Sequence, residues 1–411
     1  MKTLILRNGE DLERAAEILR RGGLCVIPTE TVYGIACDAG NPEALARLRE
    51  LKGRAADKPF SLLVREIPGG GSADIERLTR AFTPGPLTLV LPRRAWEDNT
   101  NMRVPGDSIG LRVPGDSIGL RVPAQETTLA LLELCGFPLA APSANAAEEE
   151  PPVSFDDALG RFDGRVECAI DGGDCARGVE STILDMTAEP PRILRRGAIT
   201  KRALEETLGG KIDGMTVIGI TGGSGAGKTT AMRVLKTLGA EAIDCDEVYH
   251  ELLTSPDMLS ELSERFPGVV TDKMTLDRKA LGEIVFRDKE ALRDLNKITH
   301  GYVGREVARL LREYQRSGAR LAAVDAIALI ESGRAAMCDL TVAVIAPEEV
   351  RVKRIMERDG ISEEYARRRV SAQKPEEFYR EGCDDALIND GDEREFERRC
   401  REYFEEYLIN I

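Results

Sequence analysis

Histidine is scarce in this sequence: its 411 residues include two, His250 and His300. A metal centre built from several imidazoles is therefore excluded. The nine cysteines form no Cys-x-x-Cys pair, which indicates reduced thiols in a cytoplasmic protein. No apolar run approaches the roughly 20 residues that span a bilayer, so no membrane partner is expected. Glu10 and Asp11 follow the short N-terminal apolar patch, which predicts a strand and a helix and not a secretory signal.

Basic residues are outnumbered: 57 Lys and Arg face 71 Asp and Glu, giving a formal net charge of -14. This charge disfavours broad binding of polyanions, so DNA is not an expected partner. The 42% of hydrophobic and 31% of charged residues are typical of a soluble globular protein. At roughly 150 residues per domain, the length predicts about two domains.

A glycine-rich stretch, Leu208–Gly214, separates two parts of the chain. A β-branched run, Thr216–Ile220, follows at once, so we predict domains at residues 1–210 and 215–411. Strand and helix patterns alternate in both parts, which predicts the α/β class, and in the second part they favour a parallel sheet flanked by helices. The predicted elements include the helices Pro42–Lys52 and Thr127–Leu134 and the strands Leu24–Pro28, Leu87–Leu91, Leu139–Ala141, Ser181–Asp185, Leu321–Val324 and Leu340–Ile345.

Residues Gly222–Thr229 fit the phosphate-loop pattern G-x-x-x-x-G-K-[ST], between the apolar run and a predicted helix over Thr230–Leu238. Glycines let successive backbone N–H groups converge on phosphate oxygens, and the helix directs its positive end at them. Lys228 is expected to reach the β- and γ-phosphates of ATP, and the Thr229 hydroxyl to ligate Mg2+. The expected ATP-binding residues are Gly222, Gly223, Ser224, Gly225, Ala226, Gly227, Lys228, Thr229 and Thr230.

Two carboxylates, Asp244 and Asp246, lie at the end of the next apolar run, Ala242–Asp246. In a strand this spacing puts both side chains on one face. The alternative is a helix cap that begins at Asp246 and Glu247. Because the pair follows the phosphate-loop helix, we favour a general base for an acceptor hydroxyl.

The run Val217–Leu253, VIGITGGSGAGKTTAMRVLKTLGAEAIDCDEVYHELL, resembles the beginning of dephospho-CoA kinases, which have a TGG…GKS/T loop followed by IDAD. The resemblance covers essentially all of residues 215–411. It also rests on the segments Leu276–Leu281, Val285–Phe286, Leu295–His300, Val324–Asp325, Glu331–Gly333, Arg354–Asp359, Gln373 and Asp384–Asn389.

This resemblance implies a P-loop kinase with a helical lid that transfers the ATP γ-phosphoryl group to the ribose 3′-hydroxyl of dephospho-CoA. It implies that Asp246 is the general base, that Lys228 binds the phosphates and that Arg358 is a lid arginine on the transferring group. Gly301 and Ile327 depart from the family pattern in segments expected to face the acceptor. A different small-molecule P-loop kinase and a regulatory P-loop ATPase therefore remain as alternatives.

The first part carries short polar motifs at the ends of its predicted strands. Lys52, Arg54 and Lys58 put three cations in seven residues, an arrangement suited to phosphate binding, although a solvated turn has a similar composition. In order, the motifs PTETVYG, KGR…KP, PGPLT, RVP, SAN, GVESTI and LRRG resemble the YrdC-like threonylcarbamoyl-AMP synthase family over residues 1–210.

This second resemblance implies a twisted-sheet α/β domain that converts ATP, L-threonine and bicarbonate to threonylcarbamoyl-AMP and pyrophosphate. The product is the donor for a tRNA adenosine modification, so proteins of tRNA modification are expected downstream partners. The implied threonine-binding residues are Thr31, Arg121 and Ser181. The implied ATP-binding residues are Lys52, Arg54, Lys58, Ser117, Ser143, Asn145 and Arg195.

One departure from this family follows the SAN motif, where Ala146–Glu150 replaces the usual glycine. Its three glutamates would repel a triphosphate unless they point away from it. The alternative for residues 1–210 is a non-catalytic RNA- or nucleotide-binding module.

The nonapeptide RVPGDSIGL occurs twice in tandem, at Arg103–Leu111 and Arg112–Leu120. Nine residues repeated twice indicate a local duplication and not a repeat architecture. Because nine is odd and a strand alternates its faces, both copies cannot lie on one strand with the same side chains inward. A third Arg-Val-Pro directly precedes the predicted helix, so Arg121 and Ser117 are expected at the site, and Arg112, with Ser108, outside it.

Overall fold

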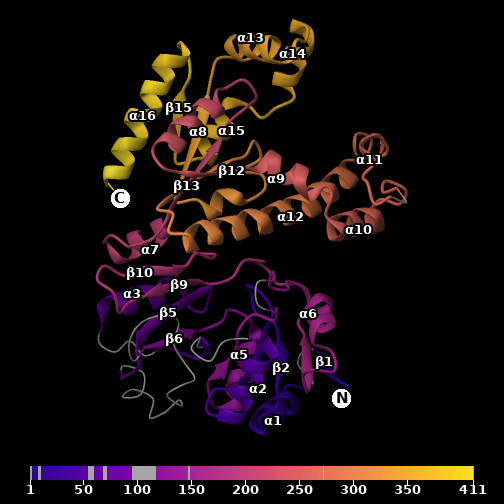
Figure 1. The fold of residues 1–411 in the computed structure, drawn as a ribbon, viewed down its shortest axis with the longest axis vertical. Helices are drawn as coiled ribbons and strands as arrows, with labels where there is room; N and C mark the ends of the chain where they lie inside the picture. The colour runs from indigo at the N-terminus through magenta and orange to yellow at the C-terminus, as the bar shows by residue number, and fades with distance from the viewer. Residues whose placement is uncertain are drawn as a thin grey trace. The chain divides into compact units, whose positions relative to one another are not determined.

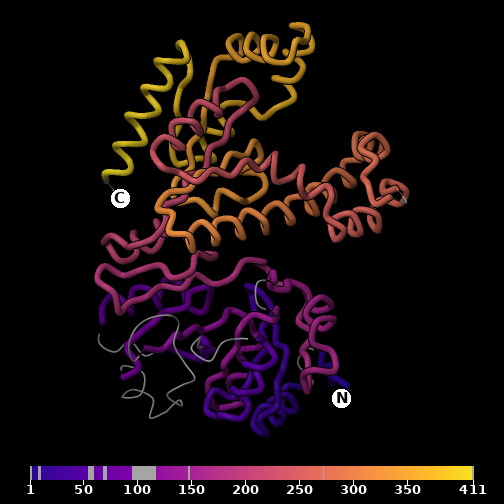
Figure 2. The backbone as a smooth tube through the Cα atoms, viewed as in Figure 1, coloured from indigo at the N-terminus to yellow at the C-terminus, as the bar shows by residue number. Residues whose placement is uncertain are grey.

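The computed structural model describes residues 2–7, 11–53, 60–67, 72–94, 117–146, 149–271 and 273–410. The chain divides into two compact units, Met1–Gly214 and Met215–Ile411 (Figure 1). The backbone passes from the first unit to the second after α7 (Figure 2). Within the described ranges, no helix is both long and apolar enough to cross a membrane.

The described residues of the first unit form a ten-stranded mixed sheet. The sheet contains parallel pairs such as β4 and β6 and antiparallel pairs such as β5 and β6. Across the sheet the strands are β1 (Leu4–Arg7), β8 (Cys168–Asp171), β2 (Cys25–Ile27), β3 (Gly34–Asp38), β7 (Leu139–Ala140), β4 (Leu62–Leu63), β6 (Ser117–Arg121), β5 (Leu87–Pro92), β9 (Thr182–Asp185) and β10 (Arg192–Arg195).

Helices cover both faces of this sheet, because alternate strand residues contribute to two separate cores. In β2, Cys25 and Ile27 pack in one core and Val26 packs in the other. The core that contains Cys25 is closed by α1 (Leu12–Arg20) and α5 (Glu126–Cys135). The core that contains Val26 is closed by α2 (Pro42–Lys52), α3 (Ala73–Phe82), α6 (Phe155–Phe162) and α7 (Lys201–Leu208).

The described residues of the second unit form a five-stranded parallel sheet, which confirms the predicted fold class. Its strands, in order across the sheet, are β12 (Glu241–Asp244), β13 (Leu321–Asp325), β11 (Thr216–Thr221), β14 (Leu340–Ile345) and β15 (Asp385–Ile388). One face packs against α8 (Lys228–Thr237) and α16 (Glu393–Asn410), which lie side by side (Figure 1). The other face packs against α9 (Cys245–Leu252) and the long α12 (Lys289–Arg316).

The remaining helices form two smaller groups in this unit. The first, α10 (Pro256–Arg265) and α11 (Arg278–Val285), shares a small core with the beginning of α12. The second pairs α13 (Glu348–Asp359) with α14 (Glu363–Ser371), at the place of the expected helical lid. A short 3-10 turn, η1 (Arg334–Met337), precedes β14, and α15 (Glu376–Gly382) packs beside β14 and β15.

The predicted strands and helices are confirmed with small shifts of their ends, except at the pair of carboxylates. The run Ala242–Asp246 was expected to carry Asp244 and Asp246 on one face of a strand, and that is wrong. The strand ends at Asp244, whose carboxylate accepts the N–H groups of Asp246 and Glu247 as the N-cap of α9. Asp246 therefore lies in the first turn of a helix, because capping by Asp244 stops the strand.

The glycine-rich stretch before the second unit is packed against the first unit. Gly209 ends α7 with a φ of 70°, a left-handed conformation that favours glycine. Ile212 is 3% exposed and belongs to the core that contains Val26. Asp213 forms a parallel bridge with Arg192 of β10, and Nε of Arg192 lies 2.8 Å from Oδ2 of Asp213.

We expect a fragment of residues 1–214 to be more stable than one of residues 1–210. The shorter fragment loses the buried Ile212 side chain and the Asp213 ion pair, which together should lower the free energy of unfolding by about 2 kcal/mol. Urea titration of both fragments, with the fragment 215–411 alongside, measures this difference. Equal midpoints for 1–210 and 1–214 would show that the stretch contributes nothing to the first unit.

Candidate functional site

The first unit has a cavity where the ends of several strands meet. Side chains far apart in the sequence line it, and they include six of the residues predicted for the synthase site. The lining residues that belong to this predicted set are Thr31, Lys52, Arg121, Ser143, Ser181 and Arg195. Of the other predicted residues, Arg54 and Lys58 lie outside the described residues. The first nonapeptide, which includes Ser108, and Arg112 also lie outside them.

Arg121 is the last residue of β6 and is held by the segment that follows β2. Its Nη2 atom lies 2.8 Å from Glu30 Oε1, and both side chains are less than 10% exposed. The same Nη2 donates to Oγ1 of Thr31 at 2.9 Å, and Nε donates to the Gly85 carbonyl at 3.3 Å. A buried guanidinium with these partners is fixed in position and charge-balanced by Glu30.

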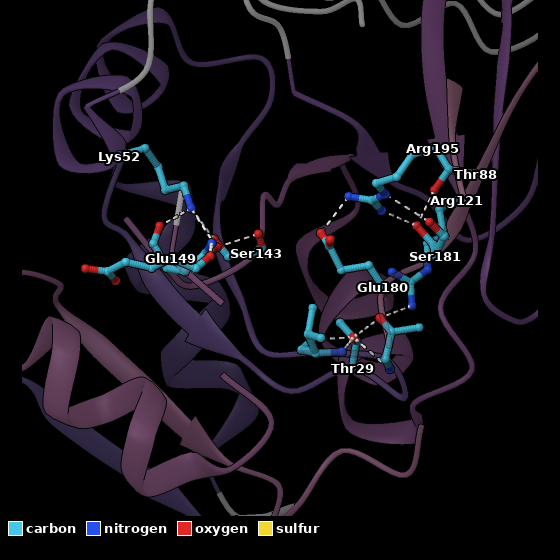
Figure 3. Close-up of polar contacts among 12 residues, drawn as sticks. Thr29, Lys52, Thr88, Arg121, Ser143, Glu149, Glu180, Ser181 and Arg195 are labelled. Atoms are coloured by element: carbon cyan, nitrogen blue, oxygen red, sulfur yellow. Dashed lines mark hydrogen bonds and ion pairs between the residues drawn. The ribbon is translucent and has the colours of Figure 1, made fainter. Parts of the chain in front are cut away.

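A second guanidinium, Arg195 at the end of β10, is arranged in a similar way (Figure 3). Its Nη1 donates to Oε1 of Glu180 at 2.6 Å, and its Nη2 donates to Oγ of Ser181 at 2.8 Å. The Ser181 hydroxyl also lies 2.9 Å from Oγ1 of Thr88. In both places an arginine contacts a glutamate carboxylate and the hydroxyl of the residue that follows the glutamate. Arg121 contacts Glu30 and Thr31, and Arg195 contacts Glu180 and Ser181.

The sequence alone did not single out Glu30 or Glu180. Both glutamates lie inside quoted motifs, and each directly precedes a hydroxyl residue predicted to bind threonine. That spacing is the signal that could have identified them. Their pairing with Arg121 and Arg195 depends on strand order, which the local sequence does not encode.

Lys52, at the end of α2, ties that helix to the turn after β7. Its Nζ atom donates to the carbonyl oxygens of Ser143 and Asn145 and to Oδ1 of Asn145. Asn145 Oδ1 also accepts the Ser143 hydroxyl at 2.6 Å. The predicted Lys52 and Asn145 therefore contact each other. Ser117, at the start of β6, is not among the described residues that line the cavity.

The acidic stretch after Asn145 is partly described, and Glu149 points away from Lys52 (Figure 3). Its Oε2 atom lies 3.2 Å from Nη1 of Arg161 on α6 and accepts the N–H of Ala146 at the same distance. This pairing reduces the repulsion that Glu149 would exert on a bound triphosphate.

In the second unit, the phosphate loop joins the end of β11 to the start of α8. A Cβ atom on Gly222 would lie 2.2 Å from the Val344 carbonyl oxygen, and one on Gly227 would lie 2.1 Å from Nδ2 of Asn389. Both glycines have a positive φ, 137° and 108°, so only glycine fits at either position. Lys228 begins α8, and its Nζ donates to the Gly222 carbonyl at 3.2 Å.

The lid helix α13 contacts this loop through arginines that the sequence prediction did not include. Arg351 Nε donates to the Ser224 carbonyl at 3.0 Å, and Arg354 Nη1 donates to the Gly225 carbonyl at 3.3 Å. The predicted Arg358 is largely exposed and pairs with Asp359 at 2.7 Å, so it does not reach the loop. All three arginines share one helix face by their spacing, which is the signal that could have identified the other two.

Three residues at the carboxyl ends of adjacent strands lie in one row. Parallel pairing places Asp325 of β13 opposite both Ile220 of β11 and Asp244 of β12. Asp325 Oδ1 is buried and has no hydrogen-bonding partner within the described part of the unit. The pKa of Asp325 is raised to about 6: burial is the main cause, Lys228 opposes it, and the charges of Asp244 and Asp246 add to it.

Two family models match the chain. Residues 17–197 match the Sua5/YciO/YrdC family, described as telomere recombination, and residues 216–395 match the dephospho-CoA kinase family. A threonylcarbamoyl-AMP synthase of Pyrococcus abyssi is 38% identical over 230 residues, which make up 50% of this chain and 61% of that protein. The chain thus spans about three fifths of the length of this relative.

A dephospho-CoA kinase of Dehalococcoides mccartyi is 38% identical over 160 residues, 39% of this chain and 81% of that protein. The crystal structure of Pyrococcus abyssi Sua5 complexed with L-threonine is similar at 25% identity and a TM-score of 0.48, covering 84% of this chain and 100% of that one. The chain belongs to the dephospho-CoA kinase family through residues 216–395, and fused to this part are residues 17–197, which match the Sua5/YciO/YrdC family model.

Proposed function

We propose that the chain is a bifunctional enzyme. Its first unit forms threonylcarbamoyl-AMP and pyrophosphate from ATP, L-threonine and bicarbonate, and its second unit phosphorylates the 3′-hydroxyl of dephospho-CoA with ATP. The observation that carries the first activity is the convergence of Thr31, Arg121, Ser181 and Arg195 on one cavity. The second rests on the phosphate loop and on the family of residues 216–395.

In the synthase reaction the carbamate formed from threonine attacks the α-phosphorus of ATP, and pyrophosphate leaves. The unit has to bring two anions together, so positioning and neutralisation of charge dominate catalysis. Arg121, with the hydroxyls of Thr31 and Ser181, is assigned to threonine, and Arg195 with Lys52 and Ser143 to ATP. Glu30 and Glu180 hold the two guanidinium groups in place for these roles.

In the kinase reaction Asp246 accepts the proton of the ribose hydroxyl while that oxygen attacks the γ-phosphorus, and ADP leaves. Asp246 is exposed at the first turn of α9, two residues after the capping Asp244. Lys228 neutralises the phosphates, and backbone N–H groups of the loop hold their oxygens. Arg351 and Arg354 of the lid contact the loop, and Arg358 on the same helix is assigned to the transferring phosphoryl group.

Mg2+ fits the residues at the phosphate loop. The buried, unpartnered Oδ1 of Asp325 is the kind of hard oxygen donor that this ion prefers, and Thr229 supplies a hydroxyl. No group of three or more acidic, histidine or cysteine ligands occurs in the described residues, so phosphate oxygens and water would complete the coordination. When bound, Mg2+ neutralises charge on the β- and γ-phosphates.

We place the enzyme in the cytoplasm, with tRNA-modification proteins downstream of its first product. All nine cysteines lie in the described part of the chain, and each is a free thiol. Free thiols in this number suit a reducing compartment.

Replacing Asp246 with Asn should lower phosphorylation of dephospho-CoA by roughly 100-fold or more, because the amide cannot accept the hydroxyl proton. ATP binding should persist, since the phosphate loop is untouched. Steady-state kinetics and calorimetric ATP titration of the full chain measure the two effects, and unchanged turnover would remove Asp246 from the role of base.

Replacing Arg121 with Ala should abolish threonine-dependent release of pyrophosphate, a loss of at least about 100-fold. The matched control is Arg112→Ala in the duplicated segment, which should leave the rate nearly intact. Arg121→Ala also leaves the buried carboxylate of Glu30 without its positive partner, which can destabilise the fold. Thr31→Val is therefore a milder variant, and its KM for threonine should rise. A normal rate in Arg121→Ala together with a lost rate in Arg112→Ala would assign the site to the other copy.

The raised pKa of Asp325 predicts a pH-dependent stability. Between about pH 3.8 and pH 6 the folded protein binds more protons at Asp325 than the unfolded protein, so its contribution to stability falls as pH rises through this window. Asp325→Asn removes that loss. The variant should therefore gain on the order of 1–2 kcal/mol over the parent at pH 7.5, and little below pH 4, after allowance for partial exposure.

Hydrogen–deuterium exchange of β13 peptides in urea, with EDTA and without nucleotide, measures this difference across pH. A stability difference that stays constant from pH 4 to pH 7.5 would contradict the raised pKa.

A further inference from the structure

Arg334 is a buried cation of the second unit that the proposed reaction has not used. It begins η1, between the loop after β13 and the start of β14, and is 6% exposed. Its Nε and Nη1 atoms are buried and have no hydrogen-bonding partner in the described part of the chain. Burying a guanidinium without a hydrogen-bond acceptor costs free energy. Another interaction, such as the binding of a ligand, has to offset this cost.

The groups around Arg334 come from the side of the sheet where the acceptor is expected. Burial lowers the pKa of Arg334, and the nearby carboxylates of Asp246 and Glu331 oppose that effect. Cys245 and Asp246 are the first two residues of α9, which packs against α12. The unpaired guanidinium therefore lies near the proposed general base.

His300, on α12, is a further neighbour of Arg334. Burial lowers the pKa of His300, and the positive charge of Arg334 lowers it further. The lowered pKa disfavours a second positive charge beside the guanidinium. What the guanidinium lacks is a hydrogen-bonding partner for Nε and Nη1 among the described residues.

Asp246 acts electrostatically on two groups of the second unit. One is Asp325, on which Lys228 of the phosphate loop also acts. The other is Arg334. Lys228 is assigned to the phosphates of ATP, so the second cation near Asp246 is available for the molecule that carries the attacking hydroxyl.

We propose that Arg334 binds the diphosphate of the acceptor, the group that joins the adenosine of dephospho-CoA to its pantetheine arm. This inference rests on the proposed kinase function. The planar N–H donors of a guanidinium match phosphate oxygens, and the diphosphate supplies the acceptors that Nε and Nη1 lack. Arg334 is then a specificity residue: it recognises the nucleotide part of the acceptor and orients the ribose toward Asp246.

The test uses the full chain and the variants Arg334→Met and Arg334→Lys, with Arg316→Met, at the exposed end of α12, as a control for net charge. Calorimetric titration gives the Kd for dephospho-CoA and, separately, for ATP. We expect the Kd for dephospho-CoA to rise about 30-fold in Arg334→Met and less in Arg334→Lys, with the Kd for ATP within about twofold of the parent value. Arg316→Met should change neither.

A second measurement distinguishes a ligand-binding residue from a structural one. Because Nε and Nη1 lack partners without ligand, Arg334→Met should raise the Tm of the ligand-free protein, while the Tm increase caused by dephospho-CoA should largely disappear. A lowered ligand-free Tm with an unchanged Kd would show that Arg334 serves the fold, and equal weakening of ATP and dephospho-CoA would show a general effect on the site. Either result overturns the inference. If the parent chain neither binds nor phosphorylates dephospho-CoA, the proposed kinase function fails instead.

Discussion

Parallel strand register is the constraint on which the kinase site depends. The pairing of β13 with β11 and with β12 puts Ile220, Asp325 and Asp244 in one row at the carboxyl edge of the sheet. The phosphate loop leaves that row after Thr221, and α9 leaves it after Asp244. The loop, the unpartnered Asp325 and the proposed base therefore meet at one edge, as ligand sites of open parallel sheets generally do.

Capping fixes the position of Asp246 within this arrangement. Asp244 accepts two N–H groups and starts α9, so Asp246 lies in the first turn of a helix. A carboxylate in the first turn of a helix interacts favourably with the helix dipole. The same carboxylate acts electrostatically on Asp325, beside the phosphate loop, and on Arg334. Asp246 thus interacts both with the group beside the phosphate loop and with the arginine that we assign to the acceptor.

The sequence predicted those features that depend on local chemistry. The phosphate loop needs glycines, a lysine and a hydroxyl at fixed spacing, and Gly222 and Gly227 are required because their neighbours leave no room for a Cβ atom. Helix α2 was predicted with its exact bounds because Asn41 caps it, Pro42 opens it and Gly53 ends it. The ordered motifs of the first part were sufficient to select Thr31, Arg121, Ser181 and Arg195.

What the sequence could not predict depends on long-range contacts. The strand-face interpretation of Asp244 and Asp246 was wrong because a cap competes with strand continuation. The contacts of Arg351 and Arg354 with the phosphate loop were not predicted, because they form only when α13 packs against the loop. The significance of Arg334 is that it has no partner, which becomes visible only when the surrounding helices are in place.

The central claim is that one polypeptide carries two independent ATP-dependent activities. The most direct measurement is mass spectrometry of the products formed by the purified chain with ATP, Mg2+, L-threonine, bicarbonate and dephospho-CoA. The account predicts both threonylcarbamoyl-AMP and CoA in that mixture, with threonine or bicarbonate omission removing only the first product and dephospho-CoA omission removing only the second. ATP consumption that yields neither product would contradict it.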